Sequence, residues 1–181
     1  RVLVVAPLSG HFASLLRNTV RTLLQDHDVY ITDWHNARDV CLGDGTFGFD
    51  DYTELVIRFM ETIGPGAHML AVCQPCVSAL AATALMAEDG NAAVPRSLTL
   101  MAGPIDASVN PTEVNNLATS RPIEWFERHV IASVPLRYRG RFRRVYPGFL
   151  QLAAFVSMNP DRHVKAHATL YDNLIAGNDI A

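Results

Sequence analysis

The sequence has few of the features that mark specialised protein classes. It contains three cysteines in 181 residues, Cys41, Cys73 and Cys76; this low, odd count does not suggest a disulfide framework and fits a reducing compartment. Charged residues make up 18% of the chain and the net charge is −3, so no overall field favours nucleic acid or anionic lipid as a partner. No apolar run reaches the roughly 18 residues that would indicate a membrane-spanning helix.

The remaining composition is that of a globular domain. Hydrophobic residues make up 49% of the chain, and its length suits one domain with a single sizeable core. The sequence starts at Arg1 inside an apolar run. We therefore expect the chain to be a piece of a longer protein, from which a targeting segment could be missing.

The first half of the chain alternates between predicted strands and helices. Short, β-branched apolar runs of this kind are typical of buried strands in a parallel sheet, and apolar residues at helical spacing follow each of the first three. The order predicts an α/β fold, a parallel sheet with helices on both faces. Asn36–Phe49 is expected to form a long loop, and Asp50 or Asp51 is expected to cap the helix after it. The predicted strands are Arg1–Pro7, Val29–Trp34, His68–Val72 and Ser97–Ala102, and the predicted helices begin near Leu15, Asp50 and Val77.

The character of the sequence changes after Asp106, and we place a boundary near Asn110. Residues 1–109 are expected to form the core that carries the candidate nucleophile. Residues 110–181 contain no clear buried strand, and helical patterns resume at Phe149–Val156 and Val164–Leu174. They are expected to form a helical cap of the same domain.

Cys73 is the strongest candidate for chemistry. The strand His68–Val72 runs directly into Cys73, and a helix is expected to begin immediately afterwards. A sharp strand-to-helix turn exposes the residue at its apex, as in the G-x-S-x-G elbow of hydrolases. Here Ala71 and Pro75 occupy the glycine positions and cysteine replaces serine. The positive end of the helix favours a thiolate nucleophile, and the Gln74 backbone N–H could stabilise an oxyanion.

Three other interpretations of Cys73 stay open at the level of sequence. It could be a buried structural cysteine, because free cysteines are often buried. Cys73 and Cys76 form a C-x-x-C pair, which could act as a redox dithiol. A zinc site needs about four ligands, and no second pair follows at a fitting distance.

The loop after the first strand is the candidate source of a second oxyanion donor. It has the sequence Leu8-Ser9-Gly10-His11 and lies where α/β-hydrolases place this donor. We expect the backbone N–H of Leu8 to donate, with Ser9 as the neighbouring candidate; the alternative is a plain turn in which Ser9 caps the next helix. His11 and Asp106 are assigned only possible supporting roles, and we expect no metal and no cofactor.

Several of these stretches together resemble the intracellular polyhydroxybutyrate depolymerases. The Cys-Gln-Pro elbow is the most specific of them. The matching segments are Ala6–Phe12, Leu15–Arg17, Val29–Trp34, Ala71–Pro75, Leu98–Asp106 and Asn110–Thr112.

The resemblance implies an α/β-hydrolase that cleaves 3-hydroxybutyrate polyester with a Cys–His–Asp triad. Cys73 matches the family nucleophile, whereas the histidine and the acid are expected downstream of Ala181, as are further strands. The substrate would be a polyester granule in the bacterial cytoplasm. The alternatives are a polyhydroxyalkanoate synthase, which would pass the same acyl group to a growing polymer, and a non-catalytic granule-binding module.

The second half is rich in aromatic and arginine side chains. The aromatic residues could contact the polyester, although packing within the cap would also explain them. Arg137–Arg144 contains five arginines, which could face an anionic granule coat or a nucleic acid. A solvated arginine face is the simpler interpretation.

Overall fold

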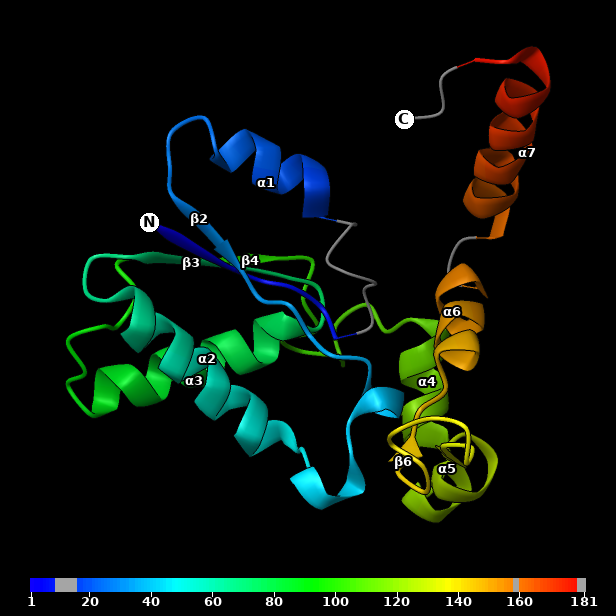
Figure 1. Ribbon diagram of the computed structural model, residues 1–181, viewed down its shortest axis with the longest axis horizontal. Coiled ribbons are helices and arrows are strands. Elements are labelled where there is room, and N and C mark those ends of the chain that lie inside the picture. Colours follow the sequence, from blue (N-terminus) through cyan, green and yellow to red (C-terminus); the bar gives the residue numbers. More distant parts are fainter. Residues whose placement is uncertain (9–15, 158–159, 179–181) are drawn as a thin grey trace. The chain divides into compact units, whose positions relative to one another are not determined.

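The computed structural model describes residues 1–8, 16–157 and 160–178. The chain divides into two compact units (Figure 1). Unit 1 comprises Arg1–Asp106 and Pro135–Arg143, and unit 2 comprises Ala107–Val134 and Arg144–Ala181. Unit 1 contains Cys73, Leu8 and Gln74, and is therefore the part that positions the candidate site.

Unit 1 is built on a parallel four-stranded sheet with the strand order β2-β1-β3-β4. The α/β class predicted from the sequence is confirmed, and each predicted apolar run contains a strand. The observed strands are shorter than three of the four predicted runs. They are β1 (Val2–Val5), β2 (Val29–Ile31), β3 (His68–Val72) and β4 (Leu98–Met101).

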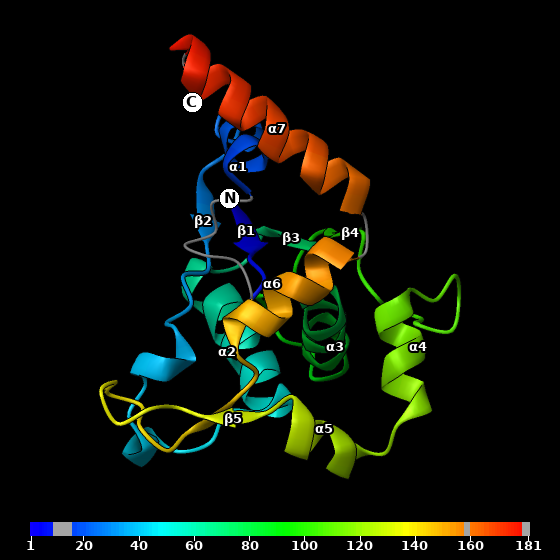
Figure 2. The same cartoon turned by 90° about the vertical axis from the view of Figure 1, so that its right-hand side faces the viewer.

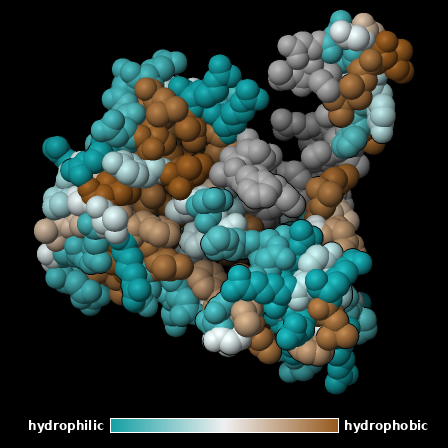
Figure 3. All heavy atoms as spheres, in the orientation of Figure 1, coloured by the Kyte–Doolittle hydropathy of each residue, from teal (hydrophilic) through white to brown (hydrophobic). Residues whose placement is uncertain are grey.

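Helices cover both faces of this sheet, as predicted. Helix α1 (Arg17–Leu23) lies on one face, and α2 (Phe49–Ile63) and α3 (Pro75–Glu88) lie together on the other (Figures 1 and 2). Apolar side chains gather on the surface over α1 and the strands beside it (Figure 3).

Alternate residues of β1 divide the core of unit 1 into two clusters. Leu3 and Val5 join the larger cluster with side chains of α2 and α3, whereas Val2 and Val4 join Leu16 in the smaller one beneath α1. This alternation is the period of two that a strand imposes on its side chains. Because both faces of the central strands are covered, β1 is apolar at every position and β3 is apolar at every position after His68.

Helix α2 begins differently from the sequence prediction, which assigned its cap to Asp50 or Asp51. Gly48 is the N-cap residue. Asp51 lies inside the first turn, where its carboxylate accepts a hydrogen bond from the Gly48 N–H at 2.7 Å. The carboxylate thus still satisfies an N–H at the helix start, but from within the helix, as in the second half of a capping box.

Asn36–Phe49 is predicted to form a loop, and α2 begins at the last of these residues. Within this loop, residues 36–47 contain two short 3-10 turns, η2 (Ala37–Asp39) and η3 (Leu42–Asp44). The Arg143 guanidinium holds this loop through three hydrogen bonds. Its Nε, Nη2 and Nη1 donate to the carbonyl oxygens of Val40, Cys41 and Gly45 at 3.2, 2.6 and 2.9 Å. These bonds lie within unit 1 and attach the segment 135–143 to it.

Unit 2 is mainly helical, as predicted, and its role as a cap stays a prediction. It also contains one antiparallel pair of two-residue strands, Ala132–Ser133 (β5) and Arg144–Val145 (β6), which the sequence analysis did not identify. Its helices are α4 (Glu113–Ser120), α5 (Ile123–His129), α6 (Gly148–Ser157) and α7 (Pro160–Ala176).

Candidate active site

Cys73 lies at the apex of a strained turn between β3 and α3. Its φ angle is +66°, in the left-handed region that non-glycine residues rarely adopt. Two hydrogen bonds hold this conformation. The Cys73 N–H donates to the Met101 carbonyl at 2.8 Å, and the Cys73 carbonyl accepts from the Cys76 N–H at 3.0 Å. The side chain is exposed, as the elbow predicted from the sequence requires.

Gln74, the predicted source of an oxyanion donor, lies at the start of α3. Gln74 is the N-cap residue of α3 and Pro75 is its first residue, the position at which a missing N–H costs the helix nothing. Among the hydrogen bonds of the described residues, none is donated by the Gln74 N–H. That N–H is therefore available at the positive end of the helix.

Leu8 lies at the same edge of the sheet as Cys73. Strands β1 and β3 are parallel neighbours, with Val5 opposite Ala71. Leu8 lies three residues after Val5 and Cys73 lies two residues after Ala71, so both follow the carboxyl ends of adjacent strands. Leu8 is 40% exposed. Ser9 and His11 lie outside the described residues, so their predicted roles stay predictions.

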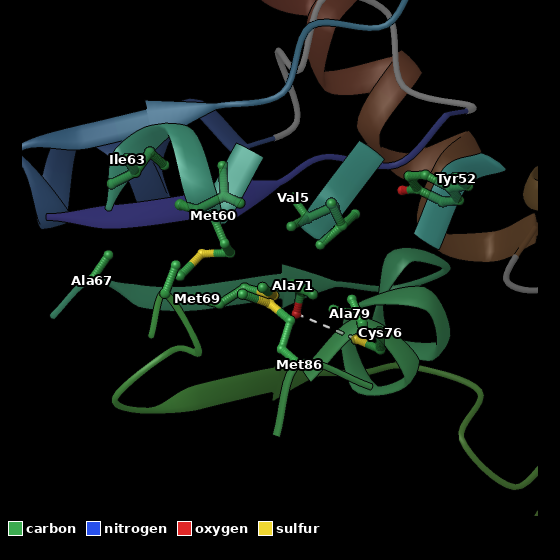
Figure 4. Close-up of a cluster of buried hydrophobic side chains, with 14 residues drawn as sticks. Val5, Tyr52, Met60, Ile63, Ala67, Met69, Ala71, Cys76, Ala79 and Met86 are labelled. Atoms are coloured by element: carbon green, nitrogen blue, oxygen red, sulfur yellow. Dashed lines mark hydrogen bonds between the residues drawn. The ribbon is translucent and has the colours of Figure 1, made fainter. Parts of the chain in front are cut away.

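Cys76 occupies a different environment from Cys73. It is fully buried, and its thiol faces the carbonyl oxygens of Ala71 and Met101 at 3.3 and 3.6 Å (Figure 4). Burial raises the pKa of the Cys76 thiol, so the uncharged thiol is favoured. Of the two thiols, that of Cys73 is the one accessible to a substrate, as the nucleophile interpretation requires.

Gly103 allows β4 to approach the elbow closely. A Cβ atom at this position would lie 2.1 Å from Cys76 Cβ, 2.4 Å from Cys76 Sγ and 3.1 Å from the Cys73 carbonyl oxygen. Only glycine fits against the start of α3 here. Gly103 directly follows the predicted strand Ser97–Ala102, but this contact could not be predicted because it joins two segments that are distant in sequence.

The backbone of Ala6, just before Leu8, is bound by side chains that the sequence analysis also missed. The Ala6 N–H donates to Thr32 Oγ1 at 2.9 Å, and the Ala6 carbonyl accepts from Trp34 Nε1 at 2.8 Å. The Tyr52 hydroxyl lies 3.5 Å from the same carbonyl. The sequence shows only that Thr32 and Trp34 follow β2 closely, and this does not reveal that they bind Ala6.

The structure brings no acid or base onto Cys73 among the described residues. No hydrogen bond there joins the Cys73 thiol to a histidine, and His11 and the side chain of His163 lie outside the description. Asp106 follows β4 and is exposed; its supporting role stays a prediction. The described residues contain no cluster of three or more histidine, cysteine or acidic side chains that could hold a metal ion.

The arginine-rich segment is divided between structural and exposed positions. Arg143 holds the loop 36–47, and Arg144 forms an ion pair with Glu127 at 3.7 Å. Arg137 and Arg38 each lie 4.9 Å from the centre of the Tyr138 ring. Arg137, Arg139, Arg141 and Arg144 are nevertheless exposed, so the solvated face of the simpler interpretation describes every arginine of the segment except Arg143.

The aromatic residues of the second half are likewise divided. Trp125 and Phe126 pack edge to face in α5, as an internally packed unit would require. Phe142 and Phe149 are 61% and 72% exposed. Further exposed apolar side chains lie on α7 (Figure 3), notably Val164, Tyr171 and Ile175.

No helix in the described ranges combines the length and apolar character that crossing a membrane requires.

One family model matches part of the chain. Residues 102–180 match the family model described as PHB de-polymerase C-terminus. The chain matches no curated protein and no solved structure. The matched residues begin at the end of β4 and cover most of unit 2, whereas Cys73 and Leu8 lie before them. The match supports the resemblance to polyhydroxybutyrate depolymerases that the sequence motifs indicated, from a part of the chain that contributed few of those motifs.

Proposed function

We propose that this chain is the nucleophile-bearing part of an α/β-hydrolase that cleaves polyhydroxyalkanoate esters, with Cys73 as the attacking group. The observation that carries the proposal is the exposed Cys73, with a φ of +66° between a buried strand and a helix N-terminus. A non-glycine residue in this conformation costs of the order of 1–3 kcal/mol, and such strain concentrates at functional sites. The match of residues 102–180 supports the polyester as the substrate.

The reaction would proceed through an acyl-enzyme. The Cys73 thiolate attacks the ester carbonyl carbon, a C–S bond forms, and the carbonyl oxygen becomes an oxyanion. The N–H groups of Leu8 and Gln74 stabilise that charge. Collapse of the intermediate breaks the C–O bond, and the alkoxide of the shortened polymer takes a proton from a histidine outside this chain. Water then attacks the thioester, releases the hydroxyacid end and restores the thiol.

The two proposed oxyanion donors, Leu8 and Gln74, follow neighbouring strands at one edge of the sheet. Leu8 follows β1 and Gln74 follows β3, and these strands are direct neighbours. Ligands of parallel α/β sheets bind at the carboxyl ends of the strands. A carbonyl oxygen above this edge would lie between the two N–H groups, while Cys73 approaches the carbonyl carbon.

The proposed substrate is an insoluble polyester in a cytoplasmic granule. Contact with such a surface needs exposed apolar groups. Unit 2 offers Phe149 and Tyr171, which are 72% and 62% exposed. We propose that these side chains contact the polymer.

The test uses the intact protein that carries this chain. Release of 3-hydroxybutyrate from amorphous granules is measured for the wild type, Cys73→Ala and Cys76→Ala. We expect Cys73→Ala to abolish release and Cys76→Ala to retain most of it once corrected for the folded fraction. Release by Cys73→Ala at the wild-type rate would refute the proposal. Polymer formation from a hydroxyacyl-CoA, with no hydrolysis, would replace it with a synthase.

A further inference from the structure

The ladder between β1 and β2 is continued by side chains at the point where β1 enters the Leu8 loop. Regular pairing ends with Val4 opposite Ile31, and Thr32 N–H still donates to the Val4 carbonyl at 3.1 Å. Ala6, the residue directly after β1, is the next one whose backbone N–H and carbonyl point toward the β2 side. Its N–H and carbonyl are bound by Thr32 Oγ1 and Trp34 Nε1 instead of by backbone groups.

These two side chains fix the backbone immediately before Leu8. Both bonds, at 2.9 and 2.8 Å, have good hydrogen-bond lengths. Thr32 is 5% exposed, so its hydroxyl is bound away from competing water. Because Ala6 and Leu8 are separated only by Pro7, whose φ is fixed by its ring, the Pro7 ψ is the one soft backbone angle between the bound Ala6 carbonyl and the Leu8 N–H.

Thr32 and Trp34 thus form a clamp on the Ala6 backbone. Tyr52 lies between this clamp and the first turn of α3, which follows the other proposed oxyanion donor, Gln74. The ring of Tyr52 meets Trp34 edge to face, with centroids 4.8 Å apart at 86°, and Tyr52 belongs to the same core cluster as Val5 and Cys76 (Figure 4). The Ser78 side chain lies near the Tyr52 hydroxyl. Ser78 in turn donates to the Pro75 carbonyl at 3.1 Å, in the first turn of α3.

We infer that Trp34 is a positioning residue for ester hydrolysis: by binding the Ala6 carbonyl, it holds the Leu8 N–H in place to stabilise the oxyanion beside Cys73. The inference rests on the proposed function. Trp34 touches neither the nucleophile nor the substrate in this account, and it acts through the backbone of residues 6–8.

Displacing the Leu8 N–H should weaken stabilisation of the transition state without weakening substrate binding. An oxyanion donor binds charge that is absent from the ester ground state, so its displacement lowers kcat and leaves KM nearly unchanged. Removing one such donor outright costs about 10²–10³ in kcat. Trp34→Phe keeps the aromatic ring and deletes the N–H, so partial displacement of Leu8 should lower kcat by about 10–100-fold.

The experiment measures kcat and KM of the intact protein on a soluble 3-hydroxybutyrate oligomer, together with the alkylation rate of Cys73 by iodoacetamide. Alkylation forms no oxyanion, so a clamp that acts only on Leu8 leaves this rate unchanged. Phe47→Leu is the matched control, because Phe47 packs against Trp34 and Tyr52 at 6.3 and 6.2 Å between centroids and forms no bond with Ala6. Thr32→Val, which removes the other half of the clamp at constant shape, is the second variant if Trp34→Phe folds poorly.

We expect Trp34→Phe to lower kcat by about 10–100-fold, with KM and the alkylation rate within about twofold of the wild type. Phe47→Leu should stay within about twofold in all three measurements. A wild-type kcat in both Trp34→Phe and Thr32→Val would overturn the inference, as would an equal fall in kcat and alkylation. If those variants are active and Cys73→Ala is inactive, only the clamp is refuted; full activity of Cys73→Ala refutes the proposed function and the clamp together.

Discussion

Replacing Gly103 with alanine tests whether the elbow depends on the close approach of β4. The added Cβ would lie 2.1 Å from Cys76 Cβ and 2.4 Å from Cys76 Sγ, whereas carbon atoms in contact prefer about 3.5–4.0 Å. One of the two segments must therefore move by about 1.5 Å. The Gly103 φ lies outside the left-handed range, so the strain comes from crowding and not from the backbone conformation.

The cost should lie at the upper end of the range for overpacked cores. Inserting a methyl group into a well-packed core typically costs about 1–3 kcal/mol. The neighbour here is the Cβ of Cys76 at the rigid start of a helix, and a rotamer change cannot move it. We therefore expect Gly103→Ala to lower the free energy of unfolding by about 3 kcal/mol, measured by urea denaturation of the intact protein.

Two further variants separate crowding from other effects. Gly43→Ala is the matched control in unit 1, because its Cβ would meet only Cys41 Sγ at 3.9 Å, and its stability should change by less than about 0.5 kcal/mol. Cys76→Gly removes both crowded atoms, so adding it to Gly103→Ala should cost less than the sum of the single changes. A change below about 0.5 kcal/mol in Gly103→Ala, or strict additivity in the double variant, would refute the reasoning.

Three other predictions concern groups within unit 1. Arg143→Ala removes three hydrogen bonds to loop carbonyls and should cost about 2 kcal/mol and speed proteolysis within residues 36–47; equal cleavage rates in Arg143→Ala and Arg141→Ala would contradict it. Because burial raises the pKa of Cys76, iodoacetamide should label Cys73 in the folded protein and Cys76 only after unfolding; early labelling of Cys76 would contradict its burial. Burial raises the pKa of Tyr52 from 10.0 to about 12, so the folded state retains this proton at a pH where the unfolded chain loses it. Stability should be unaffected by Tyr52 below about pH 10 and fall between about pH 10 and 12, a fall that Tyr52→Phe should reduce; the same slope in both proteins would show that Tyr52 is not its source.

The elements of unit 1 could be predicted from the sequence because their signals are local. A run such as His68–Val72 combines apolar, strand-favouring residues with a helix pattern directly afterwards, and the observed β3 has these bounds. The position of Cys73 at a strand-to-helix turn followed from the same local signals. β5 and β6 have two residues each, too few to produce an alternating pattern that could be recognised.

The contacts that shape the site could not be predicted, because they depend on the order of the strands. Trp34 reaches Ala6 only because β2 lies beside β1, and Gly103 meets Cys76 only because β4 lies beside β3. The function of Arg143 was equally hidden, since its partners are backbone carbonyls, which any residue possesses. The arginine-rich segment therefore predicted a charged surface, but one of its residues, Arg143, instead holds a loop in place.

The central claim is that Cys73 carries the acyl group. Its most direct test is to mix the intact protein with a 3-hydroxybutyrate oligomer, quench the reaction in acid within one turnover, and locate the acyl group by peptide mass spectrometry. The account predicts a hydroxybutyryl thioester on the peptide that contains Cys73, and its absence, together with hydrolysis, in Cys73→Ala. Hydrolysis that continues in Cys73→Ala, or an acyl group found on another residue, would contradict the account.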